Sequence, residues 1–250
     1  MNISWNAKEY QKDFSFVPAY GEGVVGLLGD IHGRRVLDVG CGNGLLTKKL
    51  CEQGAIVTGA DASETMLALA RENCPEAAYL CVDATRLTVD EPFDAVFSNA
   101  VFHWIDDEKQ DALLSRVRAA LKSGGVLACE FGGFGCAATV HAALGHALEK
   151  RGRAYQVAFY FPTIGQYAPR MEAHGLRLTD AQLFDRFTPQ GEKGLRGWIE
   201  MFVPGALNGF DADAREAILR EVEDECREKL LVDGVWHVDY VRIRLRAKAV

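Results

Sequence analysis

The chain has 250 residues, of which 48% are hydrophobic and 25% are charged, and its formal net charge is −7. This length and apolar content suit one packed core, and the acidic balance argues against nucleic acid or an anionic membrane surface as the main partner. The seven cysteines contain no C-x-x-C pair and no secretory or membrane-spanning stretch is apparent, so we expect reduced thiols and a cytoplasmic protein.

Apolar runs alternate with helix-like segments along the first half of the chain. Such alternation predicts a parallel sheet in which helices connect neighbouring strands by right-handed crossovers. We expect strands near 35–39, 55–60, 78–82, 93–98 and 125–131, and helices near 44–52, 64–73 and 108–121.

The first predicted strand contains Asp38 and leads into the sequence Gly40-Cys41-Gly42-Asn43-Gly44. Glycines at the end of a strand let backbone N–H groups approach a ligand. The spacing departs from the G-x-G-x-x-G of dinucleotide sites, and Asp38 would repel a pyrophosphate. Asp38 instead suits a ligand with a positive group, such as the ammonium of an amino acid. The alternative interpretation is that the glycines form a plain tight turn. We expect Cys41 to be a small side chain of the turn rather than a reactive thiol.

Three further strand ends carry polar residues. Asp61 closes the second strand about 20 residues after Gly40, where an acid can hold both ribose hydroxyls, although a helix N-cap is the alternative role. Asp83 follows the third strand and could accept from an adenine amino group, or be a solvated turn residue. The fourth strand ends in Ser98-Asn99-Ala100, and His103-Trp104 comes shortly after.

These motifs resemble those of the class I S-adenosylmethionine-dependent methyltransferases over roughly residues 34–132. The resemblance rests on the glycine motif at 36–44, on Asp61, on Asp83-Ala84 and on the turn at 121–127. A narrower likeness is to the small-molecule branch around trans-aconitate methyltransferase. It is carried by Trp5-Asn6 with Tyr10, Ser98-Asn99-Ala100 with His103-Trp104, Phe187-Thr188-Pro189 and Asp239-Tyr240-Val241-Arg242.

The resemblance implies a Rossmann-like α/β fold with a seven-stranded, mostly parallel sheet and helices on both faces. The implied strand order is 3-2-1-4-5-7-6, with the last strand antiparallel. The resemblance also implies S-adenosyl-L-methionine as cofactor and S-adenosyl-L-homocysteine as product. The expected cofactor-binding residues are Asp38, Gly40, Cys41, Gly42, Gly44, Asp61, Ala62, Met66, Asp83, Ala84, Asn99 and Ala100.

After residue 132 we expect a helix near 137–151, a sixth strand at 177–187, a helical region at about 192–231 and a last strand at 236–247. We expect a single domain over 1–250, with helical cap elements near 1–30, 134–175 and 190–232. The last strand alternates apolar residues with basic ones. We interpret the basic stripe as a partly solvated face rather than an anion site; it comprises Arg242, Arg244, Arg246 and Lys248.

The methyl acceptor is expected after the fourth strand, close to His103. This histidine could take a proton from a hydroxyl, donate a hydrogen bond to a carboxylate, or be structural. A carboxylate acceptor needs no base because it is ionised near pH 7, but it needs a cation, for which Arg153, Arg170 and Arg186 are candidates. The expected substrate-binding residues are Trp5, Tyr10, His103, Trp104 and Tyr160, with His103 also as the catalytic candidate.

Three functions fit this sequence. The first is a small-molecule methyltransferase directed at oxygen, on a carboxylate or a hydroxyl. The second is a protein or RNA methyltransferase, which would prefer a basic groove, or an Asn-Pro-Pro-Tyr-type motif where this chain has Ser98-Asn99-Ala100-Val101. The third is a non-catalytic protein that binds S-adenosylmethionine or S-adenosylhomocysteine. The acidic charge and the intact glycines favour the first. His141 and His146 are poorly spaced for one metal ion, so no metal is expected, and the oligomeric state is open.

Overall fold

The computed structural model describes residues 21 and 23–250, which form two compact units. The described part of the first unit runs to Phe134 and adds Phe159–Leu183 and Arg242–Val250, while the second comprises Gly135–Ala158 and Phe184–Val241. The expectation of one domain over 1–250 stays a prediction. Trp5 and Tyr10 lie outside the described residues, as does most of the cap expected near 1–30.

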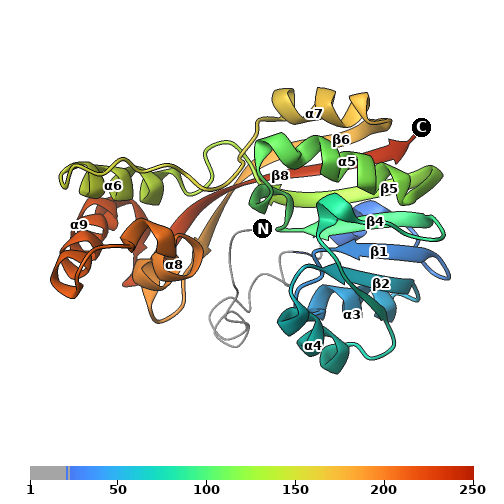
Figure 1. Cartoon of the computed structure of the whole chain (residues 1–250), viewed down its shortest axis with the longest axis horizontal. Coiled ribbons are helices and arrows are strands. Elements are labelled where there is room, and N and C mark those ends of the chain that lie inside the picture. The colour runs from blue at the N-terminus through green and yellow to red at the C-terminus, as the bar shows by residue number, and fades with distance from the viewer. Residues whose placement is uncertain (1–20, 22) are drawn as a thin grey trace. The chain divides into compact units, whose positions relative to one another are not determined.

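The sheet has the neighbour order β3-β2-β1-β4-β5-β8-β6 (Figure 1). β1 pairs in parallel with β2 and β4, β5 pairs in parallel with β4, and β8 is antiparallel to β5. This confirms the predicted order, with β8 as the seventh long strand. The strands are β1 Arg35–Val39, β2 Ile56–Asp61, β3 Ala78–Cys81, β4 Phe93–Asn99, β5 Leu121–Gly132, β6 Leu176–Pro189 and β8 Val235–Ala249.

Helices cover both faces of the sheet in the first unit, as predicted. Side chains alternate along a strand, so Val36 of β1 joins one buried cluster and Leu37 joins the other. The cluster of Val36 also contains Leu50 of α3, and the cluster of Leu37 contains residues of α5 and α7. The helical segments of this unit are η1 Gly26–Leu28, α3 Leu45–Glu52, α4 Glu64–Asn73, η2 Ala84–Arg86, η3 Phe102–Trp104, η4 Asp107–Lys109, α5 Gln110–Ala119 and α7 Ile164–Ala173.

Two elements of the first unit differ from the prediction. Helix α7 lies in the cap region expected near 134–175, where no separate helix was assigned from the sequence, and it contains Pro169. A capping box between Thr163 and Gln166 starts the helix, and Tyr167 is fully buried and donates to Gln110 Oε1 at 2.8 Å. Strand β5 begins at Leu121 rather than near residue 125, with an irregularity in its pairing to β4 where we expected a turn.

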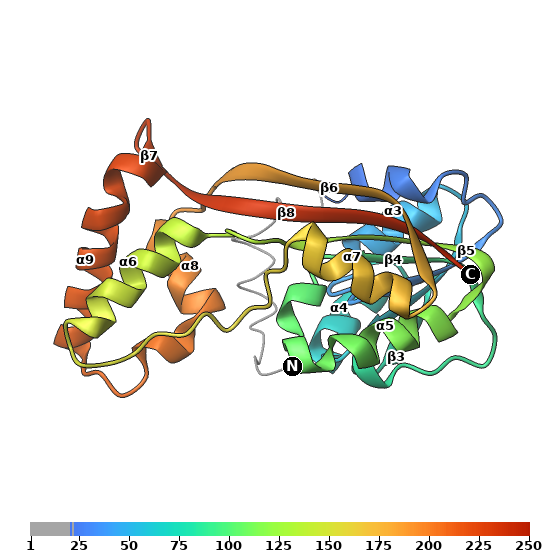
Figure 2. The same cartoon turned by 90° about the horizontal axis from the view of Figure 1, so that it is seen from above.

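The second unit is mainly helical. Its elements are α6 Ala138–Glu149, α8 Gly194–Phe202, η5 Pro204–Leu207, α9 Ala212–Leu230 and the two-residue strand β7, Leu231–Val232, which pairs with β8. Helices α6 and α9 lie side by side (Figure 2). The helix near 137–151 and the helical region at 192–231 were predicted, but β7 was not. The role of these helices as caps stays a prediction.

The last strand shows the predicted alternation. Ile243, Leu245 and Ala247 are fully buried, while the basic residues between them are partly exposed. Arg244 departs from a simple solvated face, because its Nε and Nη2 lie 2.7 Å from a carboxylate oxygen of the buried Glu130. Among residues 21 and 23–250, no helix has the length and apolar content needed to cross a membrane.

Candidate functional site

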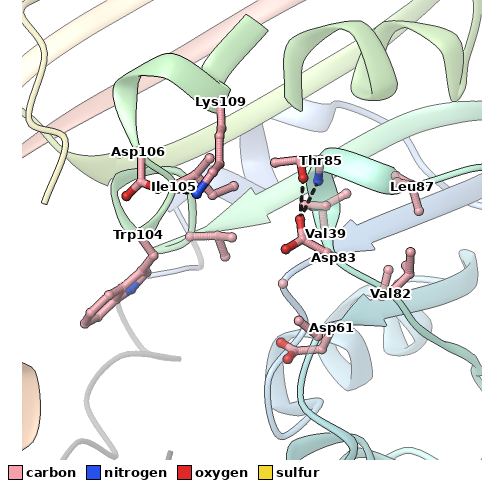
Figure 3. Close-up of a pocket in the computed structure, with 15 residues that line it drawn as sticks. Val39, Asp61, Val82, Asp83, Thr85, Leu87, Trp104, Ile105, Asp106 and Lys109 are labelled. Atoms are coloured by element: carbon pink, nitrogen blue, oxygen red, sulfur yellow. Dashed lines mark hydrogen bonds and ion pairs between the residues drawn. The ribbon is translucent and has the colours of Figure 1, made fainter. Parts of the chain in front are cut away.

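A pocket lies at the carboxyl ends of β1 to β4 in the first unit (Figure 3). About 510 Å³ of space lies between its lining residues, open solvent included. Six of the predicted site residues line it: Gly40, Asp61, Ala62, Asp83, Ala84 and Trp104. Figure 3 shows Asp61 and Asp83 on one side of the pocket and Trp104 with Lys109 on the other.

The glycine turn fits tightly against its neighbours. Gly40 has a φ of +73°, and a Cβ there would lie 2.2 Å from a side-chain carbon of Val101. Gly44 has a φ of +78°, and a Cβ there would lie 2.9 Å from the Cα of Ala70 in α4. A side chain at either position is excluded by both the backbone angle and the close approach. The backbone of the turn therefore packs closely against Val101 and against α4.

Asp61 lies between the glycine turn and the start of α4. Its Oδ2 accepts from the Gly42 N–H at 3.0 Å and its Oδ1 accepts from the Ser63 N–H at 2.8 Å. Ser63, not Asp61, is the N-cap of α4, since its Oγ accepts from the backbone of Met66. Burial raises the pKa of Asp61, and these backbone N–H groups oppose the rise. A carboxylate has about four acceptor positions, so Asp61 keeps capacity for ligand hydroxyls.

Asp83 is the second acid of the pocket. Its Oδ1 accepts from the Thr85 backbone N–H at 2.8 Å and from the Thr85 hydroxyl at 2.7 Å. Burial acts to raise the pKa of Asp83, but the hydrogen bonds from Thr85 outweigh it and the pKa is lowered. Asp83 is therefore ionised at neutral pH and can accept from a donor group of a ligand.

Asp38 lies inside the protein and is not among the residues that line the pocket. It is 2% exposed and its Oδ2 accepts from the Thr47 hydroxyl at 2.7 Å. Burial raises its pKa to about 7, opposed by the Thr47 hydrogen bond and supported by the charge of Asp61. Its expected contact with a ligand ammonium stays a prediction.

The other predicted cofactor residues are not among the residues that line the pocket. Cys41 is buried and its thiol pKa is strongly raised by burial, which favours the small-side-chain role over a reactive thiol. Met66 is buried in α4. Asn99 ends β4, and Ala100 adopts a left-handed conformation with φ 61°, from which its carbonyl accepts from Trp104 Nε1 at 3.1 Å. This hydrogen bond holds the Trp104 ring that lines the pocket.

His103 is buried beside the pocket-lining Trp104, with ring centroids 5.3 Å apart. Its Nδ1 accepts from the Gly132 N–H at 3.1 Å. Burial lowers its pKa well below the ordinary value of 6.5, and the charge of Arg242 lowers it further. The ring is therefore neutral and carries its proton on Nε2. This geometry suits His103 to donate a hydrogen bond from Nε2 and opposes a role in taking a proton at Nδ1.

The aromatic segment 159–161 packs around His103. The rings of Phe159 and Phe161 lie 6.0 Å from it, and Phe159 meets Trp104 edge-on at 4.8 Å. Tyr160 instead places its hydroxyl 3.2 Å from Arg170, away from the pocket lining. The expected roles of His103, Trp104 and Tyr160 in substrate binding stay predictions.

The three candidate carboxylate-binding arginines have other neighbours. Arg170 pairs with Asp107 and Asp111. Arg153 donates to the Asn208 carbonyl and lies over the ring of Phe210, and Arg186 lies over the ring of Phe184. Sequence reasoning missed Lys109, which lines the pocket beside Asp106. It placed Arg242 in the basic stripe of the last strand, whereas the charge of Arg242 acts on His103. The only sequence signal for Lys109 was its position shortly after His103-Trp104.

Comparison with known proteins identifies the family that this chain resembles. A family model described as a methyltransferase domain matches residues 36–125. An uncharacterized methyltransferase of Schizosaccharomyces pombe is 30% identical and the match covers 97% of both chains. The trans-aconitate 2-methyltransferase of Variovorax paradoxus is 43% identical over 99 residues, which are 38% of each chain.

A solved structure extends the likeness to the fold. The Haemonchus contortus phosphoethanolamine N-methyltransferase 2, solved with phosphomonomethylethanolamine and S-adenosylhomocysteine, superposes with a TM-score of 0.59 and 21% identity. The superposition covers 92% of this chain and 52% of that one. From the near-complete match to a methyltransferase, the matched domain and the strand order, we conclude that this chain belongs to the class I S-adenosylmethionine-dependent methyltransferases.

Proposed function

We propose that the enzyme transfers the methyl group of S-adenosylmethionine to an oxygen of a small molecule, a carboxylate or a hydroxyl, in the cytoplasm. The observation that carries the proposal is the geometry of His103, a buried ring beside the pocket-lining Trp104 whose Nδ1 accepts from the Gly132 N–H, which leaves Nε2 to carry the proton. Such a donor orients an acceptor that already carries its negative charge. The partial match to a trans-aconitate 2-methyltransferase supports a carboxylate, and the net charge of −7 opposes RNA.

The pocket residues fit a nucleoside with a sulfonium tail. We propose that Asp61 holds the ribose hydroxyls, that Asp83 accepts from the adenine amino group, and that Val82 and Ile105 flank the base. The turn at Gly40 would face the amino acid part, with the buried carboxyl of Asp38 behind it. The further cofactor contacts that we propose are Cys41, Gly42, Gly44, Ala62, Met66, Ala84, Asn99 and Ala100.

The cofactor supplies an electrophilic methyl group, and the residues of the chain bind the cofactor and the acceptor and orient them. Because a carboxylate is ionised near pH 7, no residue has to remove a proton from it. Holding the acceptor oxygen in line with the methyl can supply several kcal/mol, up to roughly 7–11 in ideal cases. The rings of Trp104, Phe159 and Phe161 would keep water from the acceptor and suit a sulfonium cation.

Arg242 is the cation that we propose for a carboxylate acceptor. It pairs with Gly132 in the register of β5 and β8, and Gly132 is the residue whose N–H holds the His103 ring. The effect of its charge on the His103 pKa indicates that the guanidinium lies near that ring. Arg242 and the His103 Nε2–H would together meet the two oxygens of a carboxylate.

The test is transfer of radiolabelled methyl to a panel of carboxylic acids, phenols and amines. We expect label in carboxylic acids, recovered as base-labile esters. In an Arg242→Met variant, loss of one charged hydrogen bond should raise the KM for the acid about 10- to 150-fold, with the KM for S-adenosylmethionine unchanged. Lys248→Met, at the other end of the same strand face, is the control. Label only in amines, protein or RNA, or tight binding without transfer, would contradict the proposal.

A further inference from the structure

Two cysteines and a glutamate gather at the ends of α3 and α4, outside the pocket. The Sγ atoms of Cys51 and Cys74 lie 3.6 Å apart, and a carboxylate oxygen of Glu76 lies within 4.8 Å of both. Cys74 is fully buried, Cys51 is partly exposed and Glu76 is exposed. The three ligand atoms therefore converge on a point that is reached from solvent on the Glu76 side.

The sulfur separation fits a tetrahedral divalent cation. With Zn–S bonds of about 2.3 Å and a tetrahedral angle, two thiolates on one zinc ion are about 3.8 Å apart. The two thiols of this chain need to move by only a few tenths of an ångström. A disulfide would require the same atoms to close to about 2.05 Å, which is a much larger displacement of two helix ends.

The electrostatic surroundings also favour a cation. Cys51 lies in the last turn of α3, and Cys74 is the C-cap residue of α4. Helix C-termini carry partial negative charge from their unpaired carbonyls, which stabilises a cation and opposes an uncompensated thiolate. The two helix C-termini and the Glu76 carboxylate therefore all place negative charge near the two thiols.

The backbone around the cluster is held firmly. The Tyr79 hydroxyl lies 2.9 Å from the carbonyl oxygens of both Ala70 and Cys74. Next to Cys74, the Asn73 amide donates to the Asn43 carbonyl in the glycine turn at 2.9 Å. Asn73 therefore connects the cluster to the glycine turn, which faces the cofactor pocket.

We propose that Cys51, Cys74 and Glu76 form a binding site for a thiophilic divalent cation of the zinc class, with water as the remaining ligand, which braces α3 against α4 behind the glycine turn. Two thiolates and one carboxylate supply anionic ligands to the cation, and this borderline-soft set selects zinc over magnesium or calcium. The site requires no change in the methyl-transfer residues and is independent of the proposed acceptor.

The experiment titrates the full-length reduced protein with Cd²⁺ and Co²⁺ and follows sulfur-to-metal charge-transfer and tetrahedral Co²⁺ absorption, with Zn²⁺ competition. We expect one ion per chain, displaced by Zn²⁺, and a rise in Tm with Zn²⁺. Cys51→Ser and Cys74→Ser should each weaken binding at least tenfold, and Glu76→Gln, at an exposed position, should weaken it several-fold. Cys81→Ser, which removes an exposed thiol of β3, is the control.

The measurement stays decisive if one cysteine variant folds poorly, because Glu76→Gln tests the third ligand in an intact core. Absence of a sulfur-to-metal band in the wild type would overturn the proposal. Binding that persists unchanged in Cys51→Ser and in Glu76→Gln would also overturn it. Methyl transfer enters none of these readouts.

Discussion

Replacing Asp61 tests the proposed ribose contact. Asp61 lines the pocket, and each of its oxygens accepts one backbone N–H, from Gly42 and from Ser63. Two ribose hydroxyls donating to the same carboxylate would add two charge-assisted hydrogen bonds. At about 1.5 kcal/mol each, the low end for such bonds, their loss costs about 3 kcal/mol, or roughly 150-fold in Kd. Asp61→Ala should therefore weaken binding of S-adenosylhomocysteine by about two orders of magnitude.

The assay is isothermal titration calorimetry with S-adenosylhomocysteine, which cannot transfer a methyl group during the measurement. Because the variant also leaves the Gly42 and Ser63 N–H groups without this acceptor, it should lower the free energy of unfolding by about 1–3 kcal/mol. Urea unfolding without ligand measures that loss separately. The control is Asp90→Asn, at an exposed position, which should leave Kd unchanged. A Kd for folded Asp61→Ala within twofold of wild type would refute the reasoning.

Three further predictions concern stability. Gly44→Ala should cost about 1–3 kcal/mol more than Gly124→Ala in urea unfolding, because both glycines have φ near +75° but only Gly44 faces close backbone atoms; equal losses would contradict this. The free energy of unfolding of wild type, relative to that of Asp38→Asn, should fall as pH rises from about 4 through about 7. The Asp38 carboxyl has a pKa of about 7 in the folded protein but 3.8 in the unfolded chain, so over this range the folded state binds the extra proton. A difference in unfolding free energy that does not change with pH would count against this reasoning. Arg244→Met should lower the free energy of unfolding by about 3–5 kcal/mol, because it removes the Arg244 charge that pairs with the buried Glu130, and adding Glu130→Gln should restore part of the loss. An Arg244→Met variant as stable as wild type would show that the ion pair is unimportant.

Much of the fold follows from local sequence patterns. Helix α4 spans Glu64–Asn73 as predicted, because Ser63 gives a clear N-cap before an amphipathic run. No helix was assigned at 164–173 from the sequence, although a capping box between Thr163 and Gln166 marks the start of α7. The start of β5 was placed too late because two adjacent glycines resemble a turn, whereas Gly124 takes a positive φ within the strand.

The pocket was predictable where chemistry coincides with a strand end. Asp61 ends β2 and Asp83 follows the end of the neighbouring parallel strand β3 by two residues, so the topology brings them together. Arg242 could not be found in this way, because its place near His103 depends on the insertion of β8 beside β5 and on its register with Gly132. The Cys51–Cys74 contact likewise arises from the packing of two helix ends, and no sequence spacing encodes it.

The central claim is that the nucleoside lies across the ends of β1 to β3, beside the His103 ring that orients the acceptor. A crystal structure of the enzyme with S-adenosylhomocysteine tests it most directly. We predict both ribose hydroxyls within hydrogen-bond distance of the Asp61 carboxylate, the adenine amino group facing Asp83, and the sulfur on the Trp104 side of the pocket. Density for the nucleoside elsewhere, or a ribose without contact to Asp61, would contradict the account.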